Sequence, residues 1–271
     1  MEPKILIEKI TKWLVDYCKA NNVNSLVVGV SGGIDSSVVE RLCEGTSIKT
    51  ICIAMPFDTN EDSESLRLAR LLCSNRDILF TVYPIGIIAK AYFATSSFVS
   101  SGFDSITNKS IYLGGEDKIR QGNIRSRIRA NILCDIAHRE GGIVVGTGNK
   151  DEDEIGYFTK WGDGAVDICP LSSIHKSTVY KIAKLLNVPK EIIDAKPTAG
   201  LWDGQTDEDE LGMTYDEVEW AIRWDDEKEK RKFLTKNRPS NYQSILIKVR
   251  DRRKSNKHKL SYPLVFDPTI N

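Results

Sequence analysis

Four short apolar segments, separated by longer segments of mixed composition, limit what this chain can fold into more than any other feature. They are residues 25–30 (SLVVGV), 48–55 (IKTICIAM), 78–85 (ILFTVYPI) and 142–148 (GIVVGTG). Continuous apolar runs of this length are typical of strands that are buried on both faces of a sheet. Strands that alternate with helices are joined by right-handed crossovers and pair in parallel. The sequence therefore predicts an α/β fold, a parallel sheet flanked by helices on both faces.

The segments around these strands carry the periodicity and the end signals of helices. We expect a first helix that ends at about residue 20, and further helices at residues 35–43, 60–75, 116–142 and 173–189 and within 215–254. Residues 89–108 are interpreted as a partly helical stretch with a loose connection, and residues 197–213 as a loop rich in Gly and Asp. Residues 89–116 and 202–212 are predicted to be mobile loops that become ordered when substrate binds. We predict one domain over residues 1–271, with a helical C-terminal extension from about residue 214.

Composition argues against several classes of protein. The chain has no net charge at pH 7, so no overall field favours nucleic acid or a membrane surface as a partner. No apolar run is long enough to span a bilayer, and the N-terminus reads as an amphipathic helix and not as a signal peptide. The 6 cysteines form no C-x-x-C pair and the 3 histidines are scattered. This pattern favours reduced, mostly buried thiols in a cytoplasmic protein over a disulfide framework or a zinc site.

Charge is distributed unevenly near the C-terminus. Acidic residues predominate over residues 203–229, and basic residues predominate over residues 228–259. Two interpretations stay open: two solvated faces that attract each other, or a basic tail that meets an anionic ligand or a partner subunit.

The stretch VVGVSGGIDSSVVERL, residues 27–42, joins the first predicted strand to a helix through a turn rich in glycine and serine. Gly32 and Gly33 permit positive φ and the close approach of an anion, and N–H groups at a helix N-terminus suit a phosphate. The stretch lacks the lysine of a Walker loop. An acid at position 35 would repel phosphate unless it holds a Mg²⁺ ion that the phosphates share. The alternative is a tight turn in which Asp35 is the N-cap of the helix.

This S-G-G-x-D-S pattern resembles the pyrophosphate-binding loop of the N-type ATP pyrophosphatases. Enzymes of that superfamily adenylate a substrate oxygen with ATP, release pyrophosphate and then let a nucleophile displace AMP. A second block, VVGTGNKDEDEIGYFTKWGDGAVDICPLSSIHKSTVYKIAKLL at residues 144–186, is similar to the NAD synthetase family within it. Residues 121–129 (QGNIRSRIR), 196–218 (KPTAGLWDGQTDEDELGMTYDEV) and 257–260 (KHKL) match further segments of that family in the same order. The resemblance covers residues 3–263.

The resemblance implies an adenine nucleotide alpha hydrolase-like fold and an ammonia-dependent NAD synthetase. The reaction would be the amidation of deamido-NAD (nicotinic acid adenine dinucleotide) to NAD, with ATP as co-substrate and Mg²⁺ as cofactor. AMP and pyrophosphate would be released. Adenylation is chemically necessary because the oxygen of a free carboxylate is a poor leaving group. Lys176 and Mg²⁺ would neutralise the opposed negative charges of ATP and the carboxylate.

The resemblance also implies roles for individual residues. ATP would contact Gly29, Val30, Ser31, Gly32, Gly33, Ile34, Asp35, Ser36, Thr147, Lys176 and Thr198. Deamido-NAD would contact Asn123, Arg127, Lys160, Asp167, His258 and Lys259. Asp35 and Glu152 would hold Mg²⁺, and the catalytic set would be Asp35, Lys176, Asp163 and Thr198. We hypothesise that Asp163 accepts a proton from ammonium.

Plainer interpretations exist for several of these residues. Lys160 and His258 are residue types often found on a solvated surface, Asp163 could be the acid of a G-D-G turn, and Glu152 belongs to a run of acids. Two other functions agree less well with the sequence. An adenylating enzyme that modifies tRNA would be expected to carry a broad basic surface or C-x-x-C pairs. A nucleotide sensor would bind ATP without turnover, and the joint presence of the catalytic residue types argues against it.

The family resemblance also sets expectations for partners. No nitrilase-type glutaminase precedes the synthetase motifs, so ammonia is the expected nitrogen donor, and a separate glutaminase subunit stays open. A homodimer is expected, with apolar residues of the helix at 116–142 as a contact. No nucleic acid or membrane partner is expected.

Overall fold

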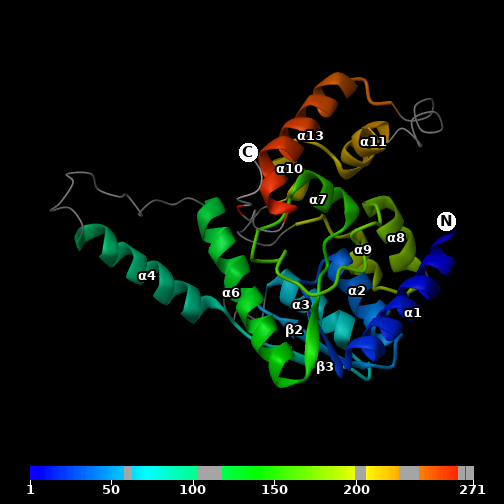
Figure 1. Cartoon of the computed structure of the whole chain (residues 1–271), viewed down its shortest axis with the longest axis vertical. Coiled ribbons are helices and arrows are strands. Elements are labelled where there is room, and N and C mark those ends of the chain that lie inside the picture. The colour runs from blue at the N-terminus through cyan, green and yellow to red at the C-terminus, as the bar shows by residue number, and fades with distance from the viewer. Residues whose placement is uncertain (58–62, 103–117, 199–205, 226–237, 262–265, 267–271) are drawn as a thin grey trace.

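In the part of the chain that the structure describes, the sheet contains four parallel strands in the order β3-β2-β1-β4. The computed structural model (Figure 1) describes residues 1–57, 63–102, 118–198, 206–225, 238–261 and 266. The strands are β1 (Ser25–Gly29), β2 (Lys49–Ala54), β3 (Leu79–Val82) and β4 (Gly142–Val145). β1 pairs with β2 on one side and with β4 on the other, so that Val28 lies beside both Cys52 and Val145. All four predicted strands are present, each shorter than its apolar segment, and their parallel pairing confirms the α/β prediction.

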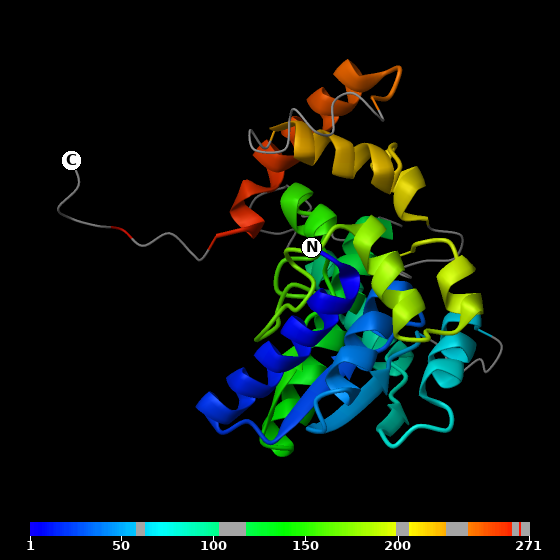
Figure 2. The ribbon, with the colours of Figure 1, turned by 90° about the vertical axis from the view of Figure 1, so that its right-hand side faces the viewer.

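Helices cover both faces of the sheet (Figures 1 and 2). One face is covered by α1 (Pro3–Asn21), α2 (Ile34–Glu44), α3 (Glu64–Cys73), α8 (Lys176–Leu185) and α9 (Lys190–Asp194), and the other by α4 (Gly86–Gly102) and α6 (Lys118–Arg139). Because side chains alternate along a strand, Leu26 and Val28 enter the first apolar cluster, and Val27 enters the second. β1 is therefore buried on both faces, which explains its uninterrupted apolar sequence.

The C-terminal helices form a further layer above the sheet (Figures 1 and 2). α11 (Tyr215–Asp225) and α13 (Tyr242–Asn256), the latter followed by a 3-10 turn at Lys257–Lys259, pack together and against α7 (Lys150–Ile155). Their shared apolar cluster includes Trp220, Ile245 and Val249. This layer is the predicted helical extension, and it lies next to the helix that follows β4.

Two short helices were not expected from the sequence, and a third helix has bounds that differ from the expected ones. The predicted loop at 197–213 contains α10 (Asp207–Leu211), which begins where the Thr206 side chain accepts a hydrogen bond from the Asp209 N–H. α7 was not predicted because its six residues are too few to show helical periodicity. α4 begins earlier than the predicted partly helical stretch and continues to Gly102. The predicted mobile segments fall partly on residues 103–117 and 199–205, which lie outside the described residues.

Two expectations from composition can be compared with the structure. The cysteines are free thiols, and Cys18, Cys43, Cys52 and Cys73 are buried while Cys134 is exposed. No helix in the described ranges of the chain is both long enough and apolar enough to cross a membrane.

Candidate active site

The loop between β1 and α2, here called the glycine–serine loop (residues 30–33), turns back on itself through Gly32. Gly32 has φ +82°, and a Cβ atom there would lie 2.4 Å from the carbonyl oxygen of Ser65. Ser31 Oγ accepts a hydrogen bond from the Gly33 N–H at 3.2 Å and lies 3.1 Å from Ser36 Oγ. The loop ends at Gly33, the N-cap of α2, and Asp35 lies in the first helical turn. The alternative in which Asp35 is the N-cap is therefore wrong.

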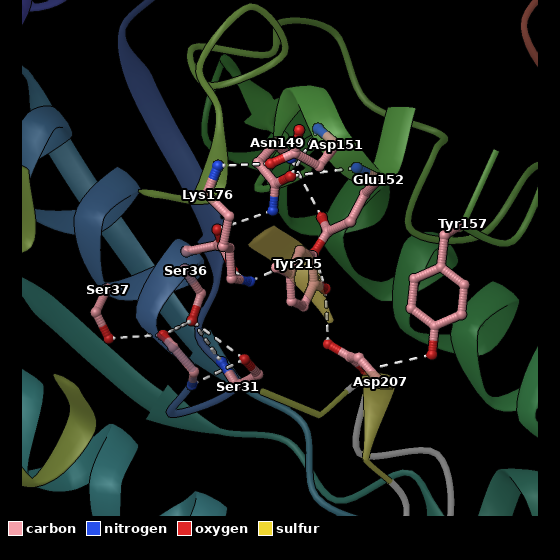
Figure 3. Close-up of polar contacts among 12 residues, drawn as sticks. Ser31, Ser36, Ser37, Asn149, Asp151, Glu152, Tyr157, Lys176, Asp207 and Tyr215 are labelled. Atoms are coloured by element: carbon pink, nitrogen blue, oxygen red, sulfur yellow. Dashed lines mark hydrogen bonds and ion pairs between the residues drawn. The ribbon is translucent and has the colours of Figure 1, made fainter. Parts of the chain in front are cut away.

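Three charged side chains from three helices meet beyond this loop. They are Asp35 of α2, Glu152 of α7 and Lys176 of α8, and we call them the acid–lysine cluster. Figure 3 shows Glu152 and Lys176 of this cluster together with Asn149. The Lys176 ammonium forms an ion pair with Asp35 Oδ2 and lies 3.5 Å from Glu152 Oε1. The lysine is only 3% exposed. Parallel strands direct the loops after β1 and β4 to one edge of the sheet, which is why residues so distant in sequence meet there.

The acid–lysine cluster carries more negative charge than its burial tolerates. Burial raises the pKa of Glu152, Lys176 acts in the opposite direction and the nearby charge of Asp35 adds to the rise, which together place the pKa at about 8. Burial alone would lower the pKa of Lys176, but the charges of Asp35 and Glu152 raise it above its ordinary value. Lys176 is thus held as an ammonium. The two carboxylates retain affinity for additional positive charge.

Asn149 fixes the start of α7 and links it to α2. Its side-chain oxygen accepts from the N–H groups of Asp151 and Glu152, and Glu152 Oε2 accepts in return from the Asn149 N–H at 3.2 Å. This reciprocal arrangement is a capping box. The side-chain amide of Asn149 also donates to Asp35 Oδ1 at 3.1 Å. Glu152 is therefore both a helix-capping residue and a member of the acid–lysine cluster.

The C-terminal helices add residues that were not assigned a role from the sequence. The Tyr215 hydroxyl lies 2.9 Å from both Glu152 Oε1 and Asp207 Oδ2, and its ring lies beside the Lys176 ammonium (Figure 3). Burial and the neighbouring carboxylates raise the pKa of Tyr215, so the hydroxyl keeps its proton and donates it. Tyr157 also reaches Asp207, at 3.3 Å. The only sequence signal for Asp207 and Tyr215 was their position inside the matching segment 196–218.

A second group joins α6, the turn after α7 and the C-terminal 3-10 turn, and we call it the α6–tail cluster. Asn123 Oδ1 accepts from the Thr159 hydroxyl at 2.7 Å, and the Arg127 guanidinium donates to the Lys160 carbonyl at 3.3 Å. The Lys160 ammonium donates to the carbonyl of His258. These contacts bring together four of the six residues that were predicted to contact deamido-NAD, Asn123, Arg127, Lys160 and His258, from three distant segments.

Two further predicted residues belong to the α6–tail cluster. Asp163 Oδ1 accepts from the Thr159 N–H at 3.0 Å and from the Ser126 hydroxyl at 2.7 Å. Lys259 donates to the carbonyls of Gly156 and Phe158, both at 2.8 Å. Asp163 thus stabilises the turn after α7, in agreement with the interpretation that it is the acid of a G-D-G turn. Its proposed exchange of a proton with ammonium stays a prediction.

The other predicted residues lie around these two groups. The side chains of Val30 and Ile34 belong to the apolar core, and Gly29 lies in β1, so these three offer an ATP molecule only backbone groups. Thr147 is half-buried between β4 and α7. Asp167 is engaged with the sheet, since its Oδ2 accepts from the Val144 N–H at 2.8 Å. Thr198 is exposed beside Pro197, whose carbonyl accepts from the Asp207 N–H at 3.1 Å.

Comparison with known proteins identifies the family. A model of the NAD synthase family matches residues 6–263. The chain belongs to the NAD synthase family. The family match covers both clusters and confirms the resemblance that the motifs carry. As a member of this family, the chain is an enzyme, a ligase.

Individual relatives show how far the similarity extends. The NH3-dependent NAD⁺ synthetase of Thermococcus kodakarensis is 41% identical over 229 residues, which are 82% of each chain. The NH3-dependent NAD⁺ synthetase of Pyrococcus furiosus is 37% identical over 225 residues, 81% of this chain and 80% of that one. The structure of an NMN synthetase from Francisella tularensis has a TM-score of 0.79 and 31% identity, and covers 98% of this chain and 99% of that one.

Proposed function

We propose that this NAD synthase family member converts deamido-NAD to NAD⁺ with ammonia, at the expense of ATP. In the first step, the nicotinate carboxylate oxygen attacks the α-phosphorus of ATP, and pyrophosphate leaves. In the second step, ammonia attacks the acyl carbon of the adenylate, and AMP leaves with the carboxylate oxygen. The observation that carries the proposal is the acid–lysine cluster, located directly beyond the glycine–serine loop.

The phosphates of ATP would lie against the glycine–serine loop. Gly32 lets the backbone turn with positive φ, and the N-terminus of α2 provides N–H groups and the positive end of a helix dipole. The Lys176 ammonium, held between two carboxylates, would neutralise charge that develops on the pyrophosphate. Thr198 is proposed to contact ATP from the segment next to α10.

The donor set of the acid–lysine cluster fits Mg²⁺. Asp35 and Glu152 present carboxylate oxygens, which are hard ligands of the kind this ion prefers, and both carboxylates lie within ion-pair distance of the same ammonium group of Lys176. When bound, the ion would neutralise phosphate oxygens and help to orient them. The protein side chains hold the geometry: Asn149 fixes Asp35, and Tyr215 fixes Glu152.

The α6–tail cluster would hold deamido-NAD. Asn123, Arg127 and Lys160 offer an amide and two cations, and His258 and Lys259 add polar groups from the C-terminal turn. Lys259 and Asn256 bond to backbone carbonyls at the end of α7, so the C-terminal turn is anchored to the helix that carries Glu152. Asp163 and Asp167 are proposed to line the same region, with Asp163 accepting the proton that ammonium must lose before it attacks.

A second candidate substrate is favoured by one observation. The F. tularensis protein that shares 31% identity and almost the full length of both chains is an NMN synthetase. If this chain had that activity, the same chemistry would amidate nicotinic acid mononucleotide. The mononucleotide would use the nicotinate end of the site and leave the adenylate half of the dinucleotide site unused.

A turnover assay tests the proposal. The protein is mixed with Mg-ATP, ammonium chloride and either deamido-NAD or nicotinic acid mononucleotide, and the amide, AMP and pyrophosphate are quantified. Amide, AMP and pyrophosphate in equal amounts from deamido-NAD support the proposal. A clear preference for the mononucleotide would favour the second candidate, and ATP binding without any amide would refute both. A parallel reaction with glutamine in place of ammonium tests the nitrogen source.

The protein is also proposed to act as a homodimer in the cytoplasm. Several apolar residues of α6, such as Ile128 and Ile132, pack against the sheet, whereas Ile119 is 60% exposed. On α4, Ile87 is 85% exposed. Light scattering coupled to gel filtration will show a mass of twice the monomer if the proposal holds.

A further inference from the structure

The first turn of α8 is capped from another helix. His175, the N-cap residue of α8, makes no side-chain capping bond, although the first N–H groups of any helix need acceptors from outside it. The acceptor for Lys176 is the carboxylate of Asp151 in α7, whose Oδ2 lies 2.7 Å from the Lys176 backbone nitrogen. The backbone of the lysine in the acid–lysine cluster is therefore anchored by the residue that precedes Glu152.

The carboxylate of Asp151 is itself held in place. Its Oδ1 lies 2.6 Å from His175 Nδ1, and the aspartate is completely buried. Each oxygen of Asp151 thus bonds to a different atom at the start of α8. Burial of a carboxylate is costly unless such bonds satisfy it, and the positive end of the α8 dipole adds a favourable interaction.

Glu219 of α11 completes a buried group, since one ligand atom from each of Asp151, His175 and Glu219 lies within 4.8 Å of the others. This set has the residue types of a metal site. However, both oxygens of Asp151 already accept hydrogen bonds, and Glu219 Oε1 pairs with Arg223 at 2.7 Å. The geometry therefore fits side chains that hold the start of α8 in place better than it fits a set of metal ligands.

We infer that Asp151, oriented by His175, is the positioning residue that holds the Lys176 ammonium between Asp35 and Glu152. A lysine side chain has a long, flexible stem, so the place of its ammonium depends on the place of its backbone. Asp151 and Glu152 are neighbours in one helix, so the bond from Asp151 to Lys176 makes the lysine and its carboxylate partner move as one unit. The expected effect of an Asp151 substitution on turnover rests on the proposed function. Its expected effect on the accessibility of the Lys176 ammonium does not.

The first arm of the test measures Lys176 without an activity assay. Folded protein is briefly treated with acetic anhydride, and acetylation of Lys176 is quantified by peptide mass spectrometry relative to the exposed Lys184 of the same helix. Lys176 is 3% exposed and is expected to be protected in the natural protein. In Asp151→Ala, acetylation of Lys176 relative to Lys184 should rise at least roughly fivefold, because local opening governs access to a buried amine.

A conservative variant separates positioning from general destabilisation. In Asp151→Asn, the side-chain oxygen still accepts from the Lys176 N–H, and the amide can donate to the neutral His175 ring. In this variant, acetylation of Lys176 relative to Lys184 should stay within about twofold of the value for the natural protein. The matched control is Ile192→Val in α9, a fully buried core position, which should lower Tm without exposing Lys176.

The second arm measures kinetics. Asp151→Ala should lower kcat roughly tenfold or more with little change in KM for deamido-NAD, because misplaced charge affects the transition state most. Asp151→Asn should recover most of kcat. Unchanged Lys176 acetylation in folded Asp151→Ala overturns the inference. If that variant does not fold, His175→Ala replaces it, and unchanged acetylation there overturns the inference equally. If the natural protein makes no amide, only the proposed function is refuted. The acetylation measurements would still show whether Asp151 positions Lys176.

Discussion

The side-chain amide of Asn149 donates a hydrogen bond to Asp35 Oδ1 at 3.1 Å, from the N-cap of α7 to the first turn of α2. The oxygen of the same amide caps α7 by accepting from the Asp151 and Glu152 N–H groups. One side chain thus stabilises a helix and fixes the relative positions of the two carboxylates proposed to hold Mg²⁺.

Substitution of Asn149 should separate these two roles. Asn149→Ser keeps an N-cap oxygen but loses the bond to Asp35, whereas Asn149→Ala loses both. We expect Asn149→Ala to lower the free energy of unfolding by about 1 kcal/mol and Asn149→Ser to lower it by less. Turnover should fall in both. Urea unfolding and the amidation assay measure the two effects, and equal stability of both variants would contradict the capping role.

Tyr215 should matter more for activity than Tyr157, although both hydroxyls bond to Asp207. Only Tyr215 also reaches Glu152, at 2.9 Å. Tyr215→Phe should therefore lower kcat/KM several-fold and cost about 1–2 kcal/mol of stability, because it leaves buried acceptors unsatisfied. Tyr157→Phe is the matched control. If the two variants lose the same activity, Tyr215 has no special effect on Glu152.

Gly32 and Gly33 should differ in their tolerance of alanine. At Gly32, φ is +82° and a Cβ atom would lie 2.4 Å from a backbone oxygen. At Gly33, the nearest atom would be Ser31 Oγ at 3.2 Å, and φ is −82°. We expect Gly32→Ala to cost more than about 2 kcal/mol, and Gly33→Ala to cost less than about 1 kcal/mol. Thermal unfolding of the two variants measures the difference, and similar Tm values would contradict it.

Glu40, which lies in the same helix as Asp35 but has no role in the proposed active site, should make the free energy of unfolding depend on pH. It is fully buried, pairs with Arg41 at 2.6 Å, and burial raises its pKa from an ordinary 4.5 to about 7, an effect that Arg41 partly offsets. Between pH 4.5 and about 7, the Glu40 carboxyl keeps its proton in the folded state and loses it in the unfolded state. The contribution of this proton to the free energy of unfolding is fully present below pH 4.5 and is lost as the pH rises through about 7.

Glu40→Gln removes this titration and provides the comparison. The stability of the natural protein relative to Glu40→Gln should fall between pH 5 and 8, by an amount on the order of 3 kcal/mol at most. Urea unfolding at a series of pH values measures it. A difference that is constant over this range, or that grows with pH, would contradict the assignment.

Much of the fold and part of the site followed from local sequence. A strand buried on both faces must be apolar throughout, so β1 could be recognised as an apolar run. β3 could be recognised in the same way, although it is an edge strand in which Leu79 is 54% exposed. The glycine–serine loop could be recognised because a tight turn beside a helix N-terminus needs its residue types. α7 and α10 were missed because one or two turns of helix are set by a capping side chain, not by periodicity. The motifs were enough to predict the family, which the match over residues 6–263 shows.

The sequence by itself determined the four strands, the longer helices, their order and the identities of Asp35, Glu152 and Lys176 as candidates. Only the tertiary structure decided that the amide of Asn149 faces Asp35 across 114 positions of sequence, and that the Tyr215 hydroxyl of α11 reaches both Glu152 and Asp207. Local preferences act over a few neighbouring residues and can be seen in a short segment. The meeting of distant side chains depends on how whole helices pack on the sheet, and that packing is the sum of contacts made all along the chain.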